Sequence, residues 1–365
     1  MPVFIRSAVR TPYGAFGGAF RRMHPEQLAA EAIAEVLRQA GIPGDRTGAL
    51  ILGQALRYGR GANPARQAAL ASGLGRSWAA WGVDQGSLSG LRAVIAGVQA
   101  ITTGEYEFLI CSGADSSSTA PYLLPAGRWG HRLGQSHALD PLLLDAAERQ
   151  EVHQKAMEDH RSQAGIPQEA IQAWVEQSRR GARFPQGGCF PVTCPVGRGP
   201  AQLDADEYLL MAEPPALGPG WPLPPLADGA AALVLSLQRP LGSAIQIIDA
   251  QEAVADHPTG ALLAATQELL ARVGLRPRDL DQVEVDESLA LSPLALRANL
   301  PGLDPLRINP RGGAFATGQA HGAEGVRLLV SLFHGLEDTG GRYGLATMET
   351  ADGQGMALLL ERTPA

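Results

Sequence analysis

The chain has 365 residues, of which 45% are hydrophobic and 18% are charged, a composition typical of a globular protein with one large domain or two ordinary ones. Its formal net charge is −7 and its sequence carries no recognisable nucleic-acid motif, which argues against a nucleic-acid partner. The cysteines Cys111, Cys189 and Cys194 are an odd and sparse set, which excludes a disulfide framework and indicates the reducing cytoplasm.

The sequence does not indicate a metal or membrane site either. Cys189 and Cys194 could supply two metal ligands, but zinc sites usually take four and no histidine pair lies beside them. The N-terminal stretch MPVFIRSAVRTP lacks the apolar core of a signal peptide, and no apolar run approaches the about 18 residues of a membrane span. We therefore expect a cytoplasmic protein without a metal ion and without membrane contact.

The first third of the chain alternates strand and helix patterns. Short apolar runs at residues 3–6, 50–52 and 108–113 are typical of buried strands. The stretch 24–42 predicts an amphipathic helix that ends at Gly41. Another helix is predicted after residue 87, with an apolar face made by Leu91, Val94, Ile95, Val98 and Ile101.

The last third repeats this order of elements. Strands and helices are predicted to alternate and to end in two strands, at residues 244–249, 260–275, 282–287, 323–333, 343–348 and 355–361. Strands that alternate with helices imply a mostly parallel sheet with helices on its faces. The pattern thus predicts an α/β fold with two equivalent halves, although the residue identity between them is weak.

The residues between the two halves have a different pattern. Pro- and Gly-rich loops are combined there with charged helix patterns at 147–161 and 167–182, and proline-rich residues 213–230 predict a rigid loop. We interpret this stretch as an inserted loop subdomain. The predicted organisation is an N-terminal half, the insertion, the end of the N-terminal half and a C-terminal half, at residues 1–119, 120–222, 223–240 and 241–365.

One turn stands out as a candidate catalytic position. The segment WGVDQGSLSGLRAVIAGVQAI, which begins at Trp81, places Ser87 between an extended run and the start of a helix. A helix N-terminus favours an anion, so enzymes often place a nucleophile at such a turn. A serine hydroxyl is far less acidic than a thiol and needs a neighbouring base.

Several segments resemble the thiolase family in the family's own order. They are SAVRTPYGAFGGAF, GQALRYGRGANPARQAALASGL, GADSSSTAPYLLPAGRWGHRLG, DGAAALVLS, INPRGGAFATGQAHGAEGVRLL and GLATMETADGQGMALLLE. The resemblance implies two βαβαβαββ halves in a five-layered α-β-α-β-α arrangement, a loop subdomain and a homodimer. The segment PYLLPAGRWGHRLG also resembles one that forms tetramers in some relatives, so a tetramer stays open.

The resemblance also implies where a catalytic site would lie. Thiolases join or cleave two acyl-CoA units with a nucleophilic Cys, an activating His, a second Cys that moves the α-carbon proton, and an Asn that helps to form an oxyanion hole. In this sequence Ser87 takes the place of the nucleophilic Cys, and Gln319 takes that of the His in G-H-P-x-G. Glu349 takes the place of the second Cys in C-x-G-G-G, and Asp286 that of the Asn in N-E-A-F-A. His321, two residues after Gln319, is a further candidate base.

These replacements change the chemistry that we expect. Gln319 cannot act as a base, and a negative charge on Asp286 opposes an oxyanion hole unless the group is protonated or paired. Asp352 adds bulk and charge where the family has a glycine. Pro224 and Pro225 replace the serine and glycine of the family's coenzyme A loop, so the sequence does not establish that coenzyme A binds.

Three functions remain open at this point. The chain is a thiolase homologue without thiolase activity, acting as a scaffold or binding protein for an acyl-CoA ligand or a protein partner. Alternatively, it is an altered acyl-CoA-processing enzyme in which Ser87, His321 and a carboxylate from Glu349, Asp352 or Asp286 form a hydrolase triad. The third reading is residual acyl-CoA C-acyltransferase activity. None of the three requires a bound cofactor, since coenzyme A or acyl-CoA would be a substrate.

Overall fold

The computed structural model describes residues 1–43, 48–130, 132–142, 158–159, 161–162, 165–182, 187–196, 199–212 and 222–364. The first half and its return strand comprise β1 (Val3–Arg10), β2 (Gly14–Ala15), α1 (Pro25–Ala40), β3 (Gly48–Gly53), α2 (Pro64–Ala71), β4 (Ala79–Val83), α3 (Ser89–Thr102), β5 (Phe108–Ser116) and β8 (Ala227–Ser236). The second half comprises β9 (Ala244–Val254), α7 (Pro258–Val273), β10 (Gln282–Val285), α8 (Leu291–Asn299), α9 (Ala314–Thr317), α10 (His321–Thr339), β11 (Tyr343–Glu349) and β12 (Gln354–Thr363). Between β5 and β8 lie α5 (Gln168–Gly181), β6 (Val192–Val196), β7 (Gly199–Leu203) and α6 (Glu207–Leu210).

The sheet topology shows the same arrangement twice. The strands lie in the order β10-β11-β12-β9-β1-β8-β5-β3-β4, and β1 pairs with β9 where the two halves join. Outward from this junction, β8, β5 and β3 of the first half correspond to β12, β11 and β10 of the second. The fourth position is β4 in the first half, and in the second half it is a single parallel bridge between Val283 and Ile308. The prediction of two equivalent halves is therefore confirmed.

The expectation of a mostly parallel sheet was wrong. Only the pairs β3–β4, β3–β5 and β10–β11 are parallel, and the other neighbours are antiparallel. The reason lies in the connections, because only strands joined through a helical crossover run parallel. β11 and β12 are joined by a tight turn, and β8 and β12 each run against both of their neighbours.

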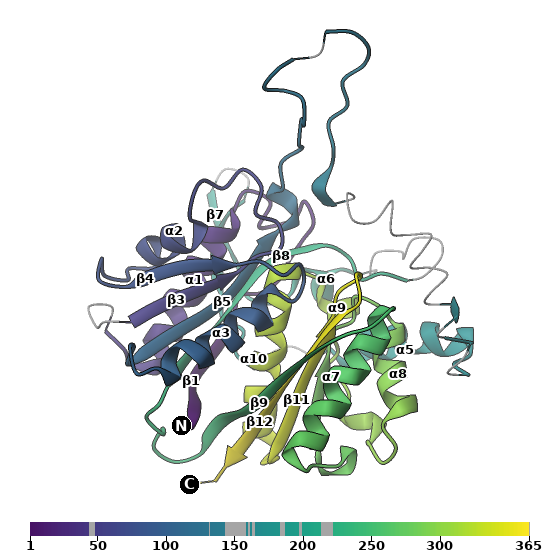
Figure 1. Cartoon of the computed structure of the whole chain (residues 1–365). Coiled ribbons are helices and arrows are strands. Elements are labelled where there is room, and N and C mark those ends of the chain that lie inside the picture. The colour runs from purple at the N-terminus through teal and green to yellow at the C-terminus, as the bar shows by residue number, and fades with distance from the viewer. Residues whose placement is uncertain are drawn as a thin grey trace.

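The helices form three layers around the two halves of the sheet (Figure 1). α1 and α2 cover the outer face of the first half, and α7 and α8 cover that of the second. α3 and α10 pack against each other between the halves, and α10 contacts strands of both. Buried apolar residues of α3, α10 and the inner sheet faces form the central core, among them Leu91, Val94, Leu329, Ile51 and Met348. These elements form the five layers that the resemblance implied.

Glycines allow the central helices to approach in backbone contact. A Cβ atom on Gly90 of α3 would lie 2.7 Å from the carbonyl oxygen of Gly322 in α10. A Cβ on Gly113 of β5 would meet the same oxygen, and a Cβ on Gly325 would meet the backbone nitrogen of Leu91. Real Cβ atoms do not approach backbone atoms so closely, so a side chain at these positions would separate α3 from α10.

A buried carboxylate holds α5 against the second half. Glu287 accepts hydrogen bonds from Trp174 Nε1 (3.1 Å) and Ser178 Oγ (2.7 Å), both on α5. It also accepts from Asn309 Nδ2 (3.0 Å) and from the backbone N–H of Phe315 (3.1 Å). α5 is the helix expected at residues 167–182, whereas the one expected at 147–161 lies outside the described residues apart from three of them.

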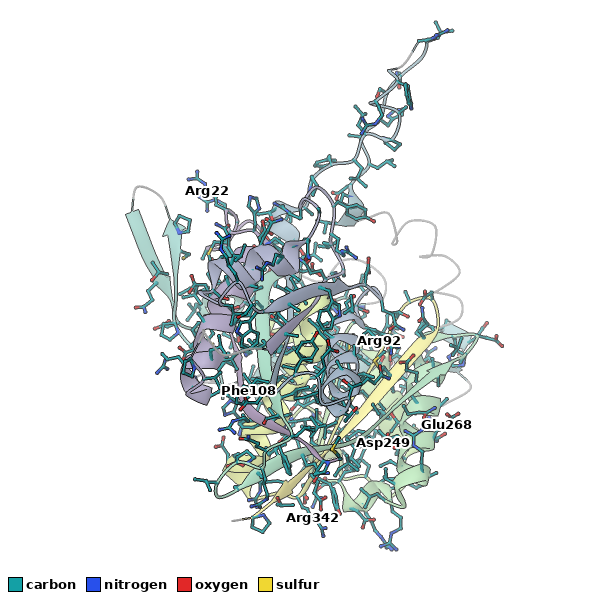
Figure 2. All side chains as sticks on the ribbon, turned by 60° about the vertical axis from the view of Figure 1, so that its left-hand side comes forward. Arg22, Arg92, Phe108, Asp249, Glu268 and Arg342 are labelled. Atoms are coloured by element: carbon teal, nitrogen blue, oxygen red, sulfur yellow. The ribbon has the colours of Figure 1, made fainter. Side chains whose placement is uncertain are left out.

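A long segment after β5 projects from the body of the molecule (Figures 1 and 2). We call residues 121–142 the arm. Leu123 and Leu139 pair at its base through two backbone hydrogen bonds, of 2.8 and 2.7 Å. Further out, Trp129 and Leu133 are 87% and 96% exposed.

We predict that Gly90→Ala destabilises the protein by about 2 kcal/mol, because the new methyl group forces apart two packed backbones. Gly82→Ala is the matched control, since its Cβ would lie at an ordinary 3.6 Å from the nearest atom, the carbonyl oxygen of Leu52. Urea unfolding of both variants measures the difference, and equal stability of the two would contradict the packing argument.

We predict that Glu287→Ala lowers the free energy of unfolding by about 3 kcal/mol, because four buried donors lose their acceptor. Glu176→Ala, on the exposed face of α5, is the control and should leave stability unchanged. The readout is again urea unfolding, together with proteolysis of the 165–182 segment. If Glu287→Ala unfolds at the wild-type urea concentration, the carboxylate does not anchor α5.

Candidate functional site

Four of the replaced residues meet where two strands end and two helices begin. Asp286 follows β10 and Glu349 ends β11, and because these strands are parallel neighbours their carboxyl ends share one edge of the sheet. The backbone N–H of Asp286 donates to the carbonyl of Thr347 (3.0 Å). Ser87 precedes α3 and Gln319 precedes α10, the two helices that cross between the halves.

Ser87 lies on a tight turn that its neighbours hold in place. Gly86 adopts a φ of 56°, and the hydroxyl of Ser89 accepts from the backbone N–H of Gln85 (2.8 Å). The Ser87 hydroxyl makes a single hydrogen bond within the described chain, to the backbone carbonyl of Glu349 (3.3 Å). A peptide carbonyl cannot take the hydroxyl proton, so this contact does not activate Ser87 as a nucleophile.

Glu349 is a buried carboxyl group. It is 2% exposed, its Oε1 is hydrogen-bonded to the hydroxyl of Ser292, and its Oε2 has no partner among the described residues. Burial, aided by the nearby Asp286 charge, raises the pKa of Glu349 to about 8, although the Ser292 hydrogen bond lowers it. At neutral pH the side chain is therefore mostly a neutral carboxylic acid, which is a poor base.

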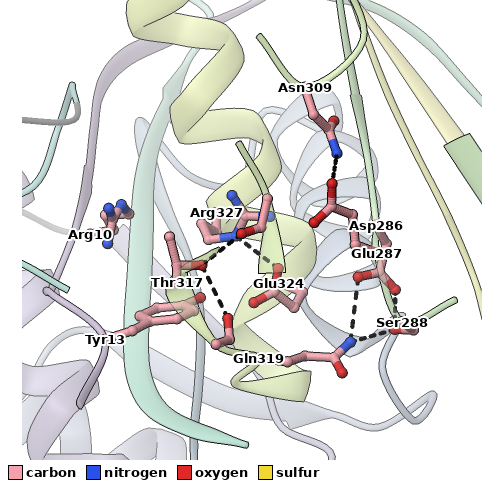
Figure 3. A network of polar contacts seen from close by, with 12 residues as sticks. Arg10, Tyr13, Asp286, Glu287, Ser288, Asn309, Thr317, Gln319, Glu324 and Arg327 are labelled. Carbon is pink, nitrogen blue, oxygen red and sulfur yellow. Dashed lines mark hydrogen bonds and ion pairs between the residues drawn. The ribbon is translucent and has the colours of Figure 1, made fainter. Parts of the chain in front are cut away.

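Asp286 belongs to a closed hydrogen-bonded cluster with Ser288 and Gln319 (Figure 3). The Ser288 hydroxyl donates to Asp286 Oδ2, and Gln319 Nε2 approaches both Ser288 Oγ and Asp286 Oδ1, the latter at 3.4 Å. Burial and the charge of Glu324 raise the pKa of Asp286 to about 7, against the lowering by Ser288 and Arg327. The N–H and O–H donors of Gln319 and Ser288 are therefore directed at acceptors within the cluster itself.

The structure does not join His321 to Ser87. His321 is the first residue of α10 and is half-buried. The one hydrogen bond of Ser87 goes to Glu349, so the serine–histidine pair of a hydrolase triad is not formed in the described chain. Asp352 lies at the β11–β12 turn, where its carboxylate accepts from the Thr350 hydroxyl.

The proline pair lies beside Gln319 rather than apart from the site. The backbone N–H of Gln319 donates to the carbonyl of Pro225 (2.8 Å), and that of Ala227 donates to the carbonyl of Gln319 (2.9 Å). Pro224 is buried and Pro225 is half-buried. Because proline has no backbone N–H, this loop offers a ligand no peptide donor at either position.

Asp115 ties the start of α10 to the loop that follows β3, and it was not singled out in the sequence. Its carboxylate accepts from the backbone N–H of Gly322 (2.6 Å), in the first turn of α10, and from those of Ala55 (3.0 Å) and Leu56 (3.1 Å). Burial raises the pKa of Asp115 to about 6, although these three donors oppose the shift. Its position at the end of the predicted strand 108–113 was the only sequence signal.

The sequence also did not reveal a group of buried charged residues next to Asp286. Arg327 Nε donates to Glu324 (2.8 Å), and both side chains are at most 1% exposed. The hydroxyl of Tyr13, Oε1 of Glu324 and Nη2 of Arg327 have no partner among the described residues. The spacing of three residues on a predicted helix could have indicated the pair, whereas Ser288 and Ser292 gave no signal beyond their closeness to Asp286 in sequence.

Within the described ranges, no group of three His, Cys, Asp or Glu side chains is placed to hold a metal ion. A search of the same residues found no helix long and apolar enough to cross a membrane.

Comparisons with known proteins agree with this architecture. The family model of the thiolase N-terminal domain matches residues 3–211, and that of the thiolase C-terminal domain matches residues 240–362. The chain is 34% identical to an acetyl-CoA acetyltransferase of Chromobacterium violaceum, over 99% of this chain and 100% of that protein. It is 31% identical to an acetyl-CoA acetyltransferase of Cupriavidus necator, over 99% of both.

Solved structures give the same result. A thiolase of Ascaris suum, crystallised in complex with coenzyme A, matches with a TM-score of 0.88 at 28% identity and covers 100% of both chains. Human mitochondrial 3-ketoacyl-CoA thiolase also has a TM-score of 0.88, at 25% identity over 99% of both chains. Because family models match both of its halves and solved thiolases share its fold, this chain belongs to the thiolase family.

Proposed function

We propose that this thiolase-family protein does not carry out ordinary thiolysis and acts as a binding or scaffold protein for acyl-CoA-type ligands or a protein partner. The observation that carries the proposal is the single hydrogen bond of Ser87, which goes to a peptide carbonyl and not to a base. Serine nucleophiles depend on a neighbouring base because their hydroxyl is so weakly acidic.

The other replaced positions support the same proposal. Glu349 carries a proton at neutral pH and is a poor base there. Gln319 directs its two N–H groups at Ser288 and Asp286, so they are not available to stabilise a negative oxygen. Each catalytic task of a thiolase therefore lacks its chemical group, although the fold that positions those groups is retained.

The two enzyme readings have less support. The hydrolase reading requires His321 to contact Ser87, and Ser87 makes no such hydrogen bond in the described chain. The acetyltransferase reading is supported by the similarity to acetyl-CoA acetyltransferases and by the fold, but neither of these supplies the missing base.

We also propose a homodimer, with a tetramer as the larger assembly. Among the described strands, β4 is an edge strand without a partner on its outer side, and its residue Ala79 is exposed. A second copy could pair there, as exposed strand edges readily do. The exposed Trp129 and Leu133 of the arm are suited to a further contact between dimers.

We predict that the purified protein cleaves acetoacetyl-CoA with free CoA at least about 10⁴-fold more slowly than the Chromobacterium violaceum relative does, because losses of this size follow removal of a catalytic unit. Ser87→Cys alone should stay near the wild-type rate, since Gln319 and Glu349 remain. The triple variant Ser87→Cys, Gln319→His and Glu349→Cys is the positive control. Substantial thiolysis by the wild type or by Ser87→Cys would overturn the proposal.

We predict that wild-type stability falls relative to Glu349→Gln as the pH rises from 4.5 towards 8. The folded state holds a proton on Glu349 up to a pKa of about 8, whereas the unfolded chain releases it near 4.5, so deprotonation favours unfolding in this window. Each unit of pKa difference is worth about 1.4 kcal/mol. Urea unfolding across this range measures the effect, and Glu105→Gln, at an exposed position, is the control. A constant difference between wild type and Glu349→Gln would show that Glu349 is ionised in the folded protein.

A further inference from the structure

The orientation of the Gln319 amide follows from its neighbours. The Ser288 hydroxyl has one proton, which it donates to Asp286, so its oxygen must accept from Gln319. The second N–H of Gln319 points to the other carboxylate oxygen of Asp286, at 3.4 Å. The reverse orientation would place the amide oxygen against a carboxylate oxygen. Gln319 therefore has its nitrogen on the Asp286 side whenever that carboxyl is ionised.

This orientation leaves the amide oxygen of Gln319 as the unused atom. The side chain is 3% exposed, and its oxygen accepts no hydrogen bond from the described chain. Figure 3 shows that oxygen on the amide without a dashed contact, whereas the nitrogen has two. Where a thiolase has an imidazole that can donate, this protein presents a fixed acceptor.

The two serine hydroxyls of the site have the same bias. The hydroxyl of Ser87 is used as a donor to the Glu349 backbone, and the hydroxyl of Ser288 is used as a donor to Asp286. Glu349 does not share this bias, because Ser292 donates to its Oε1 and the proton of the neutral carboxyl therefore lies on Oε2, which has no partner among the described residues. Beside Gln319 itself, the hydroxyl donors are thus occupied, while the amide oxygen of Gln319 has no hydrogen bond from the described chain.

We infer that the natural ligand of this site is a hydroxyacyl thioester, whose hydroxyl group donates a hydrogen bond to Gln319, rather than a ketoacyl thioester, whose carbonyl group can only accept. The inference rests on the proposed function, because it names the ligand class of a site that binds without thiolysis. Two acceptor oxygens facing each other without a proton between them repel, and a buried acceptor without a donor carries the cost of its lost hydration.

The test compares two thioesters that differ in one oxygen. The affinities of acetoacetyl-CoA and of both enantiomers of 3-hydroxybutyryl-CoA are measured by calorimetry, without free CoA. We expect one hydroxy enantiomer to bind at least about tenfold more tightly than the keto compound, a difference of about 1.4 kcal/mol. Equal or tighter binding of acetoacetyl-CoA overturns the inference. So does the absence of binding by all three compounds up to about 1 mM.

Two variants test whether the preference for the hydroxyacyl thioester depends on the Gln319 amide. Asp286→Asn keeps the shape of the side chain but can donate to the Gln319 oxygen, so the preference for the hydroxy compound should fall to about equal affinity. Gln319→Met removes the acceptor oxygen but keeps a similar side-chain volume. It should weaken the binding of the hydroxy compound and leave the binding of the keto compound unchanged. If Asp286→Asn does not fold, as its thermal unfolding will show, Gln319→Met decides the question. A preference that survives Gln319→Met overturns the inference.

The two proposals can fail separately. Rapid thiolysis of acetoacetyl-CoA in the presence of free CoA overturns the proposed function, whatever the affinities are. A slow reaction combined with tighter binding of the keto compound leaves the proposed function standing and removes the hydroxyacyl ligand.

Discussion

Contact between the backbones of α3, β5 and α10 sets the geometry of the site. Gly90 and Gly113 both face the carbonyl oxygen of Gly322 with no side chain between them. Asp115 then holds the first turn of α10 through the N–H of Gly322. Because Ser87 lies two residues before the start of α3 and Gln319 two residues before the start of α10, this contact restricts where both residues lie. The packing of α3, β5 and α10 therefore positions the candidate site whatever side chains it carries.

The candidate site residues are joined to one another by hydrogen bonds. A carboxyl, a hydroxyl and an amide from Asp286, Ser288 and Gln319 satisfy one another, as buried polar groups must. Glu349 accepts a hydrogen bond from the Ser292 hydroxyl. Its raised pKa means that the buried carboxyl group is neutralised by a proton and not by a positively charged side chain. Among the described residues, the polar groups of this cluster thus bind mainly to one another.

Burial of charge continues below this cluster. Glu324 and Arg327 form an ion pair that is almost inaccessible to solvent, and unpartnered polar atoms remain on both. The Glu324 charge also raises the pKa of Asp286, so the layers are coupled electrostatically. Buried pairs of this kind contribute little net stability, because desolvation offsets their attraction. The protonation of Asp286 therefore depends on Glu324 and Arg327 as well as on its hydrogen-bond partner Ser288.

The sequence by itself determined the family and the two equivalent halves, because these depend on local patterns and on motifs that can be read within one segment. The turn before the helix at Ser87 and the loop before Gln319 were predictable in that way. The sequence could not determine the antiparallel direction of β8 and β12, since a strand pattern is the same in either direction. Only the tertiary structure decided that Ser87 donates to a residue 262 positions away, that Ser292 reaches Glu349 and that Ser288 orients Gln319. Hydrogen-bond polarity depends on which groups from distant segments meet, and a contact of that kind leaves no mark in either segment alone.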